Sequence, residues 1–298
     1  MTKMVLAVSV MFLSGAAPGF AQSDPHAGHA TPAQAAAAPA QPAPSNPALP
    51  PGANAAAEAL KQSPRHGEYV DIRVPGASAP ITTWVVYPER KDKAGVVIVI
   101  HEIFGLTDWI RGVADQLAED GFIAVAPDLL SGKGPKGGGT AELGEEATKV
   151  IRTLTPEEIT NALNAVRDYA AKVPASNGKS ATVGFCWGGS TSFTYATNQP
   201  ALNAAVVYYG TSPQDAAAYT RVKAPVLGLY GGNDARVNAT IPLAQDEMKK
   251  AGKTYEPHTF DGAGHGFLRQ QDGQGGANMK ATEQAWPLTL GFLRKHLG

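Results

Sequence analysis

Short runs of aliphatic residues recur along the chain from about residue 69 onward, separated by turn residues and by longer amphipathic stretches. Ala94–Ile100 reads AGVVIVI, and such an unbroken apolar run is typical of a strand covered on both faces. Two earlier segments alternate apolar and polar residues around the turn-rich sequence PGASAP, so they predict an opening hairpin. The hairpin strands are predicted at 69–74 and 82–87, and further buried strands at 122–126, 180–185, 204–209 and 224–230.

The segments between these strands have the spacing of helices. Residues 157–172 place Ile159, Leu163 and Val166 three or four positions apart, which puts these side chains on one face of a helix. Because strands and helices alternate over this length, the sequence predicts an α/β fold with a mostly parallel central sheet and helices on both faces. Two further helices are predicted at 108–120 and 284–296, and a glycine-rich surface loop at 131–144.

The N-terminus differs in composition from the rest of the chain. Residues 1–21 combine Lys3, a short apolar core and small residues before Gln22, which are the parts of a cleaved signal peptide. The apolar core is too short for an ordinary membrane span, so we expect no stable membrane insertion after cleavage. The mature chain is therefore predicted to be periplasmic or secreted.

Residues 22–64 contain 24 Ala or Pro among 43 residues. Such a segment has too little large apolar surface to form a core, so we predict a disordered, semi-extended tether in which only 53–61 has the composition of a short helix. His26 and His29 lack a third ligand and would make only a weak metal site. The globular domain is then expected over 65–298, long enough for one well-filled core.

Charge and cysteine content exclude several classes of function. The 25 Lys+Arg nearly balance the 26 Asp+Glu, whereas nucleic-acid binders need clustered basic residues. The single cysteine excludes an intrachain disulfide and a Cys-rich zinc site. The glycine-rich loop lacks the Lys-plus-hydroxyl ending of a phosphate-binding loop. We therefore expect a small-molecule substrate and no cofactor, no metal and no nucleic acid; the oligomeric state is not determined by the sequence.

The sequence GFCWGG, residues 184–189, follows a predicted strand and precedes a helix-compatible segment. It has the spacing of a nucleophile elbow, the sharp turn that exposes one side chain between a strand and a helix. The nucleophile is then Cys186, and the N-terminus of the following helix favours its thiolate. The alternative is a buried structural cysteine, which the bracketing glycines disfavour.

A cysteine nucleophile needs a base, and the base needs an acid that orients it. In α/β-hydrolases these two residues follow the elbow in the order acid, histidine. Asp234 follows a predicted strand, and His265 lies in the flexible sequence DGAGHGF. Cys186, Asp234 and His265 therefore form the predicted triad, with Asp261 and His258 as competitors for the acid and the base.

The loop after the strand Ala94–Ile100 reads HEIFG. In α/β-hydrolases this loop supplies one N–H of the oxyanion hole, and the residue after the nucleophile supplies the other. We therefore assign these two donors to Ile103 and Trp187.

Glu102, in the same loop, is expected to lie close to Cys186. A carboxylate at this place can accept the thiol proton, although its negative charge also opposes a thiolate. The alternative is that Glu102 only forms an ion pair with a nearby basic residue, for which Arg269 is the candidate.

Together these motifs resemble the dienelactone hydrolase (carboxymethylenebutenolidase) family. The resemblance covers residues 70–298 and rests on HEIFGL, GFCWGG, the strand end Tyr208-Tyr209-Gly210, Asp234 and HGF. It implies an α/β-hydrolase fold and a Cys-His-Asp triad. It also implies that Glu102 holds the thiol at rest and takes its proton as substrate binds.

The resemblance also implies where substrate binds. Arg269, four residues after His265, matches a position that binds the substrate carboxylate in the family. Phe104 and Tyr208 belong to the matching motifs and are predicted as further substrate contacts. Arg152 is the candidate for a second carboxylate-binding arginine.

The sequence therefore predicts an exported hydrolase that cleaves a lactone or carboxylic ester through a thioester intermediate. A general carboxylesterase or thioesterase of the same fold is the main alternative. Two other classes are a non-catalytic ligand-binding protein and a thiol-redox protein. The lack of a second, resolving cysteine weakens the redox alternative.

Overall fold

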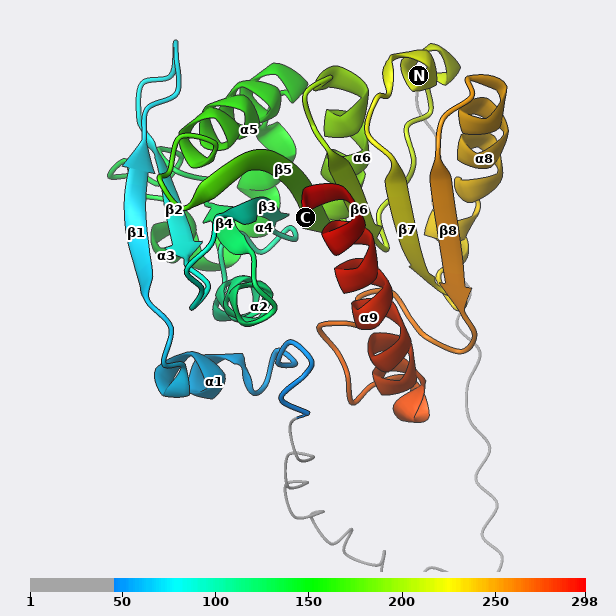
Figure 1. Ribbon diagram of the computed structural model, residues 1–298, viewed down its shortest axis with the longest axis horizontal. Helices are drawn as coiled ribbons and strands as arrows, with labels where there is room; N and C mark the ends of the chain where they lie inside the picture. Colours follow the sequence, from blue (N-terminus) through cyan, green and yellow to red (C-terminus); the bar gives the residue numbers. More distant parts are fainter. Residues whose placement is uncertain (1–45) are drawn as a thin grey trace, which may run out of the picture. The chain divides into compact units, whose positions relative to one another are not determined.

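The computed structural model describes residues 46–298, and the predicted signal peptide at 1–21 and the His26/His29 pair lie outside them. An eight-stranded sheet runs through this part of the chain in the order β1-β2-β4-β3-β5-β6-β7-β8 (Figure 1). β1 and β2 pair antiparallel, β2 pairs antiparallel with β4, and every other neighbouring pair is parallel. The strands are β1 (Gly67–Ile72), β2 (Ile81–Val86), β3 (Ala94–Ile100), β4 (Ile123–Pro127), β5 (Ser176–Phe185), β6 (Ala204–Tyr208), β7 (Val226–Gly231) and β8 (Tyr255–Phe260).

Helices connect the parallel strands. The α-helices are α1 (Ala56–Gln62), α2 (Asp108–Glu119), α3 (Thr140–Leu143), α4 (Ala147–Val150), α5 (Pro156–Ala170), α6 (Trp187–Asn198), α7 (Ala235–Asn238), α8 (Ile241–Lys250) and α9 (Ala277–Leu297). Short 3-10 helices lie at Gly144–Glu146, Ile151–Thr153, Ala216–Arg221 and Gln274–Gly276. α5 begins where its sequence dictates, because Thr155 and Glu158 form a reciprocal capping box around Pro156.

The sheet buries both of its faces, and successive side chains of one strand serve opposite faces. Val97 and Val99 of β3 join a hydrophobic cluster with α1, α2 and α9. Val96, Ile98 and Ile100 of the same strand join a second cluster with α5, α6 and α8. This alternation follows from the two-residue period of a strand. It explains why β3 carries no polar residue, and Figure 1 shows the two groups of helices on either side of the sheet.

The predicted fold class is confirmed, and most predicted elements lie within two residues of the observed ones. β3 has the predicted bounds, and the opening hairpin is present as β1 and β2. β5 begins at Ser176 and α9 at Ala277, both earlier than predicted. Their first residues are mainly polar, and the apolar pattern that predicts a strand or helix begins only after them. The predicted surface loop at 131–144 contains the one-turn helix α3 at its end.

The boundary predicted at Arg65 between tether and domain is corrected by the structure. Leu49 and Ala56 are buried in the same cluster as α2 and α9, and the Gln271 side chain donates a hydrogen bond to the Pro50 carbonyl at 2.8 Å. Small and proline side chains are poor core formers alone, but here they pack against a surface that the rest of the chain provides. α1 confirms the short helix expected in this segment.

The strand order also determines where ligands can approach. β3 lies between β4 and β5, so the chain crosses to opposite sides of β3 in successive connections. In open α/β sheets such a switch point leaves a crevice at the carboxyl ends of the strands. Glu102 and Cys186 follow these ends of β3 and β5, which are paired at Ile100 and Gly184. No helix of the described residues is both long and apolar enough to cross a membrane.

Candidate active site

Cys186 occupies a strained turn between β5 and α6. Its backbone has φ 56° and ψ −116°, a conformation that side-chain-bearing residues rarely adopt. The turn requires glycine at two positions. A Cβ on Gly184 would collide with the Gly188 carbonyl, and a Cβ on Gly188 would collide with the carbonyls of Ile100 and His101. The two glycines therefore let β5, α6 and β3 approach closely, and this is the geometry of a nucleophile elbow.

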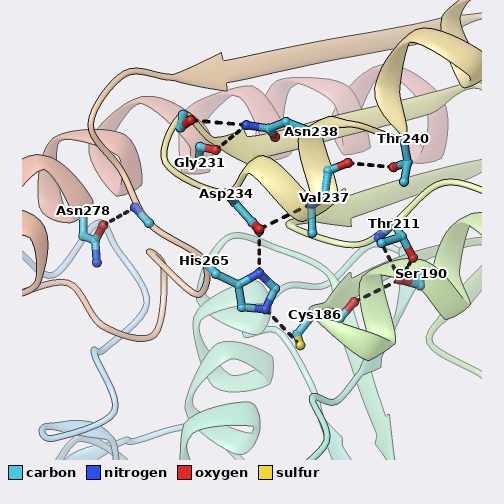
Figure 2. A network of polar contacts seen from close by, with 12 residues as sticks. Cys186, Ser190, Thr211, Gly231, Asp234, Val237, Asn238, Thr240, His265 and Asn278 are labelled. Carbon is cyan, nitrogen blue, oxygen red and sulfur yellow. Dashed lines mark hydrogen bonds and ion pairs between the residues drawn. The ribbon is translucent and has the colours of Figure 1, made fainter.

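The three residues of the predicted triad are in direct contact (Figure 2). His265 Nε2 lies 3.1 Å from Cys186 Sγ, and His265 Nδ1 lies 2.5 Å from Asp234 Oδ2. Asp234 is buried and caps α7, since its carboxylate also accepts from the Val237 N–H at 3.4 Å. A carboxylate on Nδ1 favours the tautomer in which Nε2 is free to accept the thiol proton.

The competing acid and base do not take part in this arrangement. His258 lies within β8, where it is aligned with Leu229 of β7. Asp261 is exposed at the end of that strand. Among the contacts of residues 46–298, the His265 ring bonds to Asp234 and Cys186.

The loop that carries His265 is held by a buried amide. Asn278, at the start of α9, accepts from the Gly264 N–H at 2.9 Å and donates to the Gln270 carbonyl at 2.7 Å. Asn278 thereby joins the two ends of the loop, and Figure 2 shows it on the far side of His265 from Cys186. No sequence pattern identified Asn278, because its partners are backbone groups that only the tertiary structure brings together.

Glu102 forms an ion pair with Arg269 across the site. Arg269 Nε lies 2.9 Å from Glu102 Oε2, but its N–H does not point along this line and makes no hydrogen bond within residues 46–298. The Glu102 side chain is only 5% exposed, whereas that of Arg269 is 25% exposed. The structure therefore contains the ion pair between Glu102 and Arg269 that was the alternative prediction for Glu102.

The electrostatics of the site favour a neutral thiol at rest. Burial raises the pKa of Glu102 to about 7, although the Arg269 charge opposes this rise. Burial also raises the pKa of Cys186, and the negative charge of Glu102 raises it further. The backbone N–H of Trp187 and the Arg236 charge act in the opposite direction. A proton acceptor beside Cys186 is therefore needed to generate the thiolate near neutral pH.

Of the two predicted oxyanion donors, Trp187 directly follows Cys186 at the start of α6, and Ile103 lies in the turn after β3. The Gly105 N–H donates to the Glu102 carbonyl at 3.2 Å and closes a turn; this hydrogen bond does not use the N–H of Ile103. The N–H of Trp187 is directed at Cys186 and stabilises its thiolate. The Trp187 ring stacks on the His101 ring at 5.9 Å between ring centroids.

His101 and Thr140 support the Glu102 turn from behind. His101 Nε2 accepts from the Leu129 N–H at 3.2 Å and its Nδ1 lies 2.7 Å from the Glu102 carbonyl; the acceptor role of Nε2 assigns the proton to Nδ1. Burial lowers the pKa of His101 and keeps it neutral. Thr140 accepts from the Leu106 N–H at 2.9 Å and donates to Asp128 at 2.7 Å.

Tyr208 was predicted as a substrate contact, and the structure corrects this prediction. Its side chain is fully buried in the core, and its hydroxyl lies 2.6 Å from the hydroxyl of Thr289 on α9. Tyr209 faces the site instead: its ring contacts His265 edge to face at 5.2 Å between ring centroids. The reason is the turn at the end of β6, where Tyr209 has φ 40°. The buried Tyr209 hydroxyl has no hydrogen-bond partner among residues 46–298.

The other predicted contacts divide between the site and the surface. Phe104 is 39% exposed, and the Arg269 guanidinium lies 5.1 Å from the centre of its ring. Arg152 is exposed on a short 3-10 helix, and no contact joins it to the site. Arg236, which belongs to none of the sequence motifs, is an exposed cation of α7 whose charge lowers the pKa of Cys186.

Neither of two cavities within residues 46–298 is lined by Cys186, Asp234 or His265. A cavity of about 590 Å³ lies between residues 74–81, 129–133 and the start of α5, and none of its lining residues is a predicted site residue. A smaller cavity of about 230 Å³ is lined by Trp187 and Ser190 of α6. Within residues 46–298, no three side chains of His, Cys, Asp or Glu converge to hold a metal ion.

Comparison with known proteins agrees with this geometry. Residues 81–297 match the model of the dienelactone hydrolase family. A carboxymethylenebutenolidase from Pseudomonas putida is 33% identical over 186 residues, covering 60% of this chain and 77% of that protein.

Solved structures show the same fold. A dienelactone hydrolase from Anabaena variabilis has a TM-score of 0.61 at 21% identity, covering 78% of this chain and 99% of that one. A dienelactone hydrolase-like promiscuous phosphotriesterase from metagenomic libraries has a TM-score of 0.65 at 23% identity, with coverage of 78% and 99%. The chain therefore belongs to the dienelactone hydrolase family and is an α/β-fold hydrolase of that type.

Proposed function

We propose that the chain hydrolyses a lactone or carboxylic ester by nucleophilic attack of Cys186 and through a thioester intermediate. The observation that carries this proposal is the unbroken chain of contacts from Asp234 through His265 to Cys186, at 2.5 and 3.1 Å. These distances lie within the reach that proton transfer requires.

The first step is activation of the thiol. Because the pKa of Cys186 is raised, the resting nucleophile is protonated, and a base must remove the proton. His265 is in contact with the sulfur, and Glu102, whose pKa of about 7 suits proton exchange near neutral pH, lies nearby. A substrate carboxylate that pairs with Arg269 would replace Glu102 as its partner and free Glu102 to accept the proton.

The thiolate then attacks the carbonyl carbon, and the carbon–oxygen double bond becomes a tetrahedral oxyanion. The N–H groups of Trp187 and Ile103 stabilise this oxyanion; removal of one such donor typically costs ~10²–10³-fold in rate. The carbon–oxygen bond to the leaving group breaks, and the alkoxide or enolate takes the proton that His265 or Glu102 received from Cys186. The acyl group remains on Cys186 as a thioester.

Hydrolysis of the thioester restores the enzyme. His265, oriented by Asp234, removes a proton from water, and the resulting hydroxide attacks the thioester carbonyl. The thiolate leaves, the carboxylic acid is released, and the proton on His265 returns to the Cys186 sulfur. Because sulfur leaves a tetrahedral intermediate more readily than an amine, esters, lactones and thioesters are better substrates than peptides.

The test is hydrolysis of an activated aryl ester and of a dienelactone by the mature protein, beside the Cys186→Ala variant. We expect turnover of both substrates by the wild type and none by the variant. Equal inactivity of both proteins would remove the support for the triad. The melting temperature of the variant serves as the control for folding.

A general carboxylesterase is the second candidate, and the Glu102–Arg269 pair is the observation that favours it. An arginine that already has a carboxylate partner is not free unless substrate displaces that partner. Equal activity on neutral and acid-bearing esters would support this candidate. The raised pKa of Cys186 disfavours a thiol-redox role, since such cysteines are usually thiolates.

We further propose that the chain is exported. The proposal depends on residues 1–21, whose Lys3, apolar core and small residues match a signal peptide. Expression of the full chain in a bacterium followed by cell fractionation tests it. A shortened protein in the periplasm or medium is the expected result, and a full-length cytoplasmic protein would contradict it.

A further inference from the structure

The segment from Leu49 to Ser63, called the strap below, joins two parts of the molecule that support opposite sides of the site. One is the loop that carries His265 and Arg269. The other is α2, which follows the Glu102 turn; Figure 1 shows α1 of the strap beside α2.

The strap binds the loop through backbone groups. The Ala53 N–H donates to the carbonyl of Arg269 itself at 2.9 Å. Two residues further on, the Gln271 side chain donates to the Pro50 carbonyl at 2.8 Å. The Arg269 N–H in turn donates to the Gly266 carbonyl at 3.0 Å, so the peptide units on both sides of Arg269 are fixed.

The strap binds α2 by packing and by polar contacts. Pro51 lies directly on Gly112, where an added Cβ would come within 2.8 Å of the proline ring. Ala56 is fully buried beside the same helix. At the end of the strap, the Ser63 hydroxyl donates to Asp115 of α2 at 2.6 Å.

α2 is continuous with the turn that carries Glu102 and Phe104. The Thr107 N–H donates to the Gly105 carbonyl at 2.9 Å, and the Thr107 side chain caps α2. The strap therefore connects the loop that carries Arg269 to α2, and α2 continues the turn that carries the side-chain partners of Arg269, Glu102 and Phe104. His265 has further supports of its own, because Asp234 contacts its ring and Asn278 holds the adjacent Gly264 N–H.

We propose that the strap positions Arg269 against Glu102 and Phe104, and that it thereby sets the affinity for substrates that carry a carboxylate. The proposal rests on the proposed function, in which Arg269 binds that carboxylate. The physical reason is that Glu102 and Arg269 interact through a single short contact, and small displacements of a supporting segment weaken such a contact.

The test uses the full-length mature protein with the double substitution Gly112→Ala and Gln271→Met. The first displaces Pro51 and the second removes the donor to Pro50 while keeping the side-chain length. Gly291→Ala is the matched control, because Gly291 lies in the interior of α9 and an added Cβ meets nothing within 4 Å. Both Gly→Ala changes raise helix propensity equally, so they separate strap displacement from helix stability.

The first readout is the KM for para-nitrophenyl acetate and for the mono-para-nitrophenyl ester of glutaric acid, which carries a free carboxylate. We expect the double variant to raise KM for the acid ester about fivefold, the effect of a ~1 kcal/mol contact. The kcat for both esters and the KM for the acetate should stay within about twofold. An unchanged acid-ester KM, or an equal loss on both esters, would overturn the proposal.

The second readout does not require turnover. Iodoacetamide labels the single cysteine, Cys186, at a rate that follows its thiolate fraction. If Arg269 moves away, the pKa of Glu102 rises above about 7, Glu102 loses charge near pH 7.5, and Cys186 should react faster in the double variant.

The two readouts separate the two proposals. If the wild type hydrolyses neither ester, the proposed function fails and the labelling rate alone decides for or against the strap. A labelling rate equal to that of Gly291→Ala would then overturn it. If the double variant does not fold, Gln271→Met alone, which leaves the core packing of Pro51 intact, carries the same comparison.

Discussion

The two sides of this site are built in different ways. On one side, Cys186, His265 and Asp234 are fixed by a strained backbone turn, a helix cap and an amide clamp. On the other side, Glu102 and Arg269 are joined by one ion pair without a well-directed hydrogen bond. The first side is therefore held by several contacts, whereas in our proposal a substrate carboxylate displaces Glu102 from Arg269 on the second.

The difference matches the work we propose for each side. Proton transfer and nucleophilic attack need fixed distances, and the triad supplies them before substrate arrives. Recognition of a carboxylate needs a cation whose resting partner can be displaced. Because the pKa of Glu102 is raised to about 7, its carboxyl is partly protonated near neutral pH. This weakens its ion pair with Arg269 and lowers the free-energy cost of replacing Glu102 by a substrate carboxylate.

The largest expected effect is on the fixed side. Asp234→Asn should lower kcat for an activated aryl ester by about 10⁴-fold, because the amide favours the wrong His265 tautomer. Asp261→Asn, at the exposed competitor acid, is the matched control and should be silent. A fall in kcat in Asp261→Asn instead would assign the acid role to Asp261 and contradict the assignment of Asp234 to the fixed side.

Arg269→Ala tests the side of the site formed by Glu102 and Arg269. We expect kcat/KM for an acid-bearing ester to fall about 10–100-fold, the effect of losing one charge-assisted contact, with little change for a neutral ester. Arg152→Ala, at the surface arginine that the sequence suggested, should change neither. Equal losses on both esters would mean that Arg269 supports the triad and not recognition.

Glu102→Gln should change stability in a pH-dependent way. A carboxyl whose pKa is raised from 4.5 to about 7 in the folded protein binds its proton more tightly when folded. Its presence therefore lowers the free energy of unfolding as pH rises from about 4.5 to about 7. The variant should be more stable than wild type above pH 7, by at most ~3 kcal/mol, and similar to it below pH 4.5.

Urea unfolding at pH 4.5 and pH 8 measures this difference. The same substitution removes a negative charge that raises the pKa of Cys186, so iodoacetamide should label the variant faster at pH 8. A stability difference that does not depend on pH would show that Glu102 does not titrate in this range.

The smallest effect is expected at Arg236. Its charge lowers the pKa of Cys186, so Arg236→Gln should slow labelling at neutral pH. The side chain is exposed, and its influence should be about twofold and should vanish at high salt. Arg221→Gln, another exposed arginine, is the control and should leave the rate unchanged at both salt concentrations.

Much of the fold follows from local patterns in the sequence. The sequence predicts β3 at its observed bounds because both faces of that strand are buried, and a short apolar run rich in β-branched residues is typical of such a strand. The elbow was predicted because Gly184 and Gly188 are required by close backbone approach. Elements that begin with polar residues, such as β5 and α9, were located less well.

The side-chain partners were harder to predict, since they depend on how distant segments meet. Tyr208 and Tyr209 are adjacent in sequence and both are buried. The backbone turns at Tyr209, so the Tyr208 hydroxyl contacts Thr289 of α9 whereas the Tyr209 ring contacts His265. The strap has a composition typical of disorder. It is ordered because Gly112 and the loop at Arg269 offer it a matching surface.

The sequence by itself determined the fold class, and it predicted the turn at Cys186 and the chain order of the residues that we propose as the triad. These depend on periodicity and on backbone geometry within a few neighbouring residues. Only the tertiary structure decided that Glu102 pairs with Arg269, that the Tyr209 ring contacts His265 and that the strap packs against the loop carrying Arg269. Each of these depends on contacts between segments far apart in the chain, where the free energy of packing, and not local propensity, selects the partner.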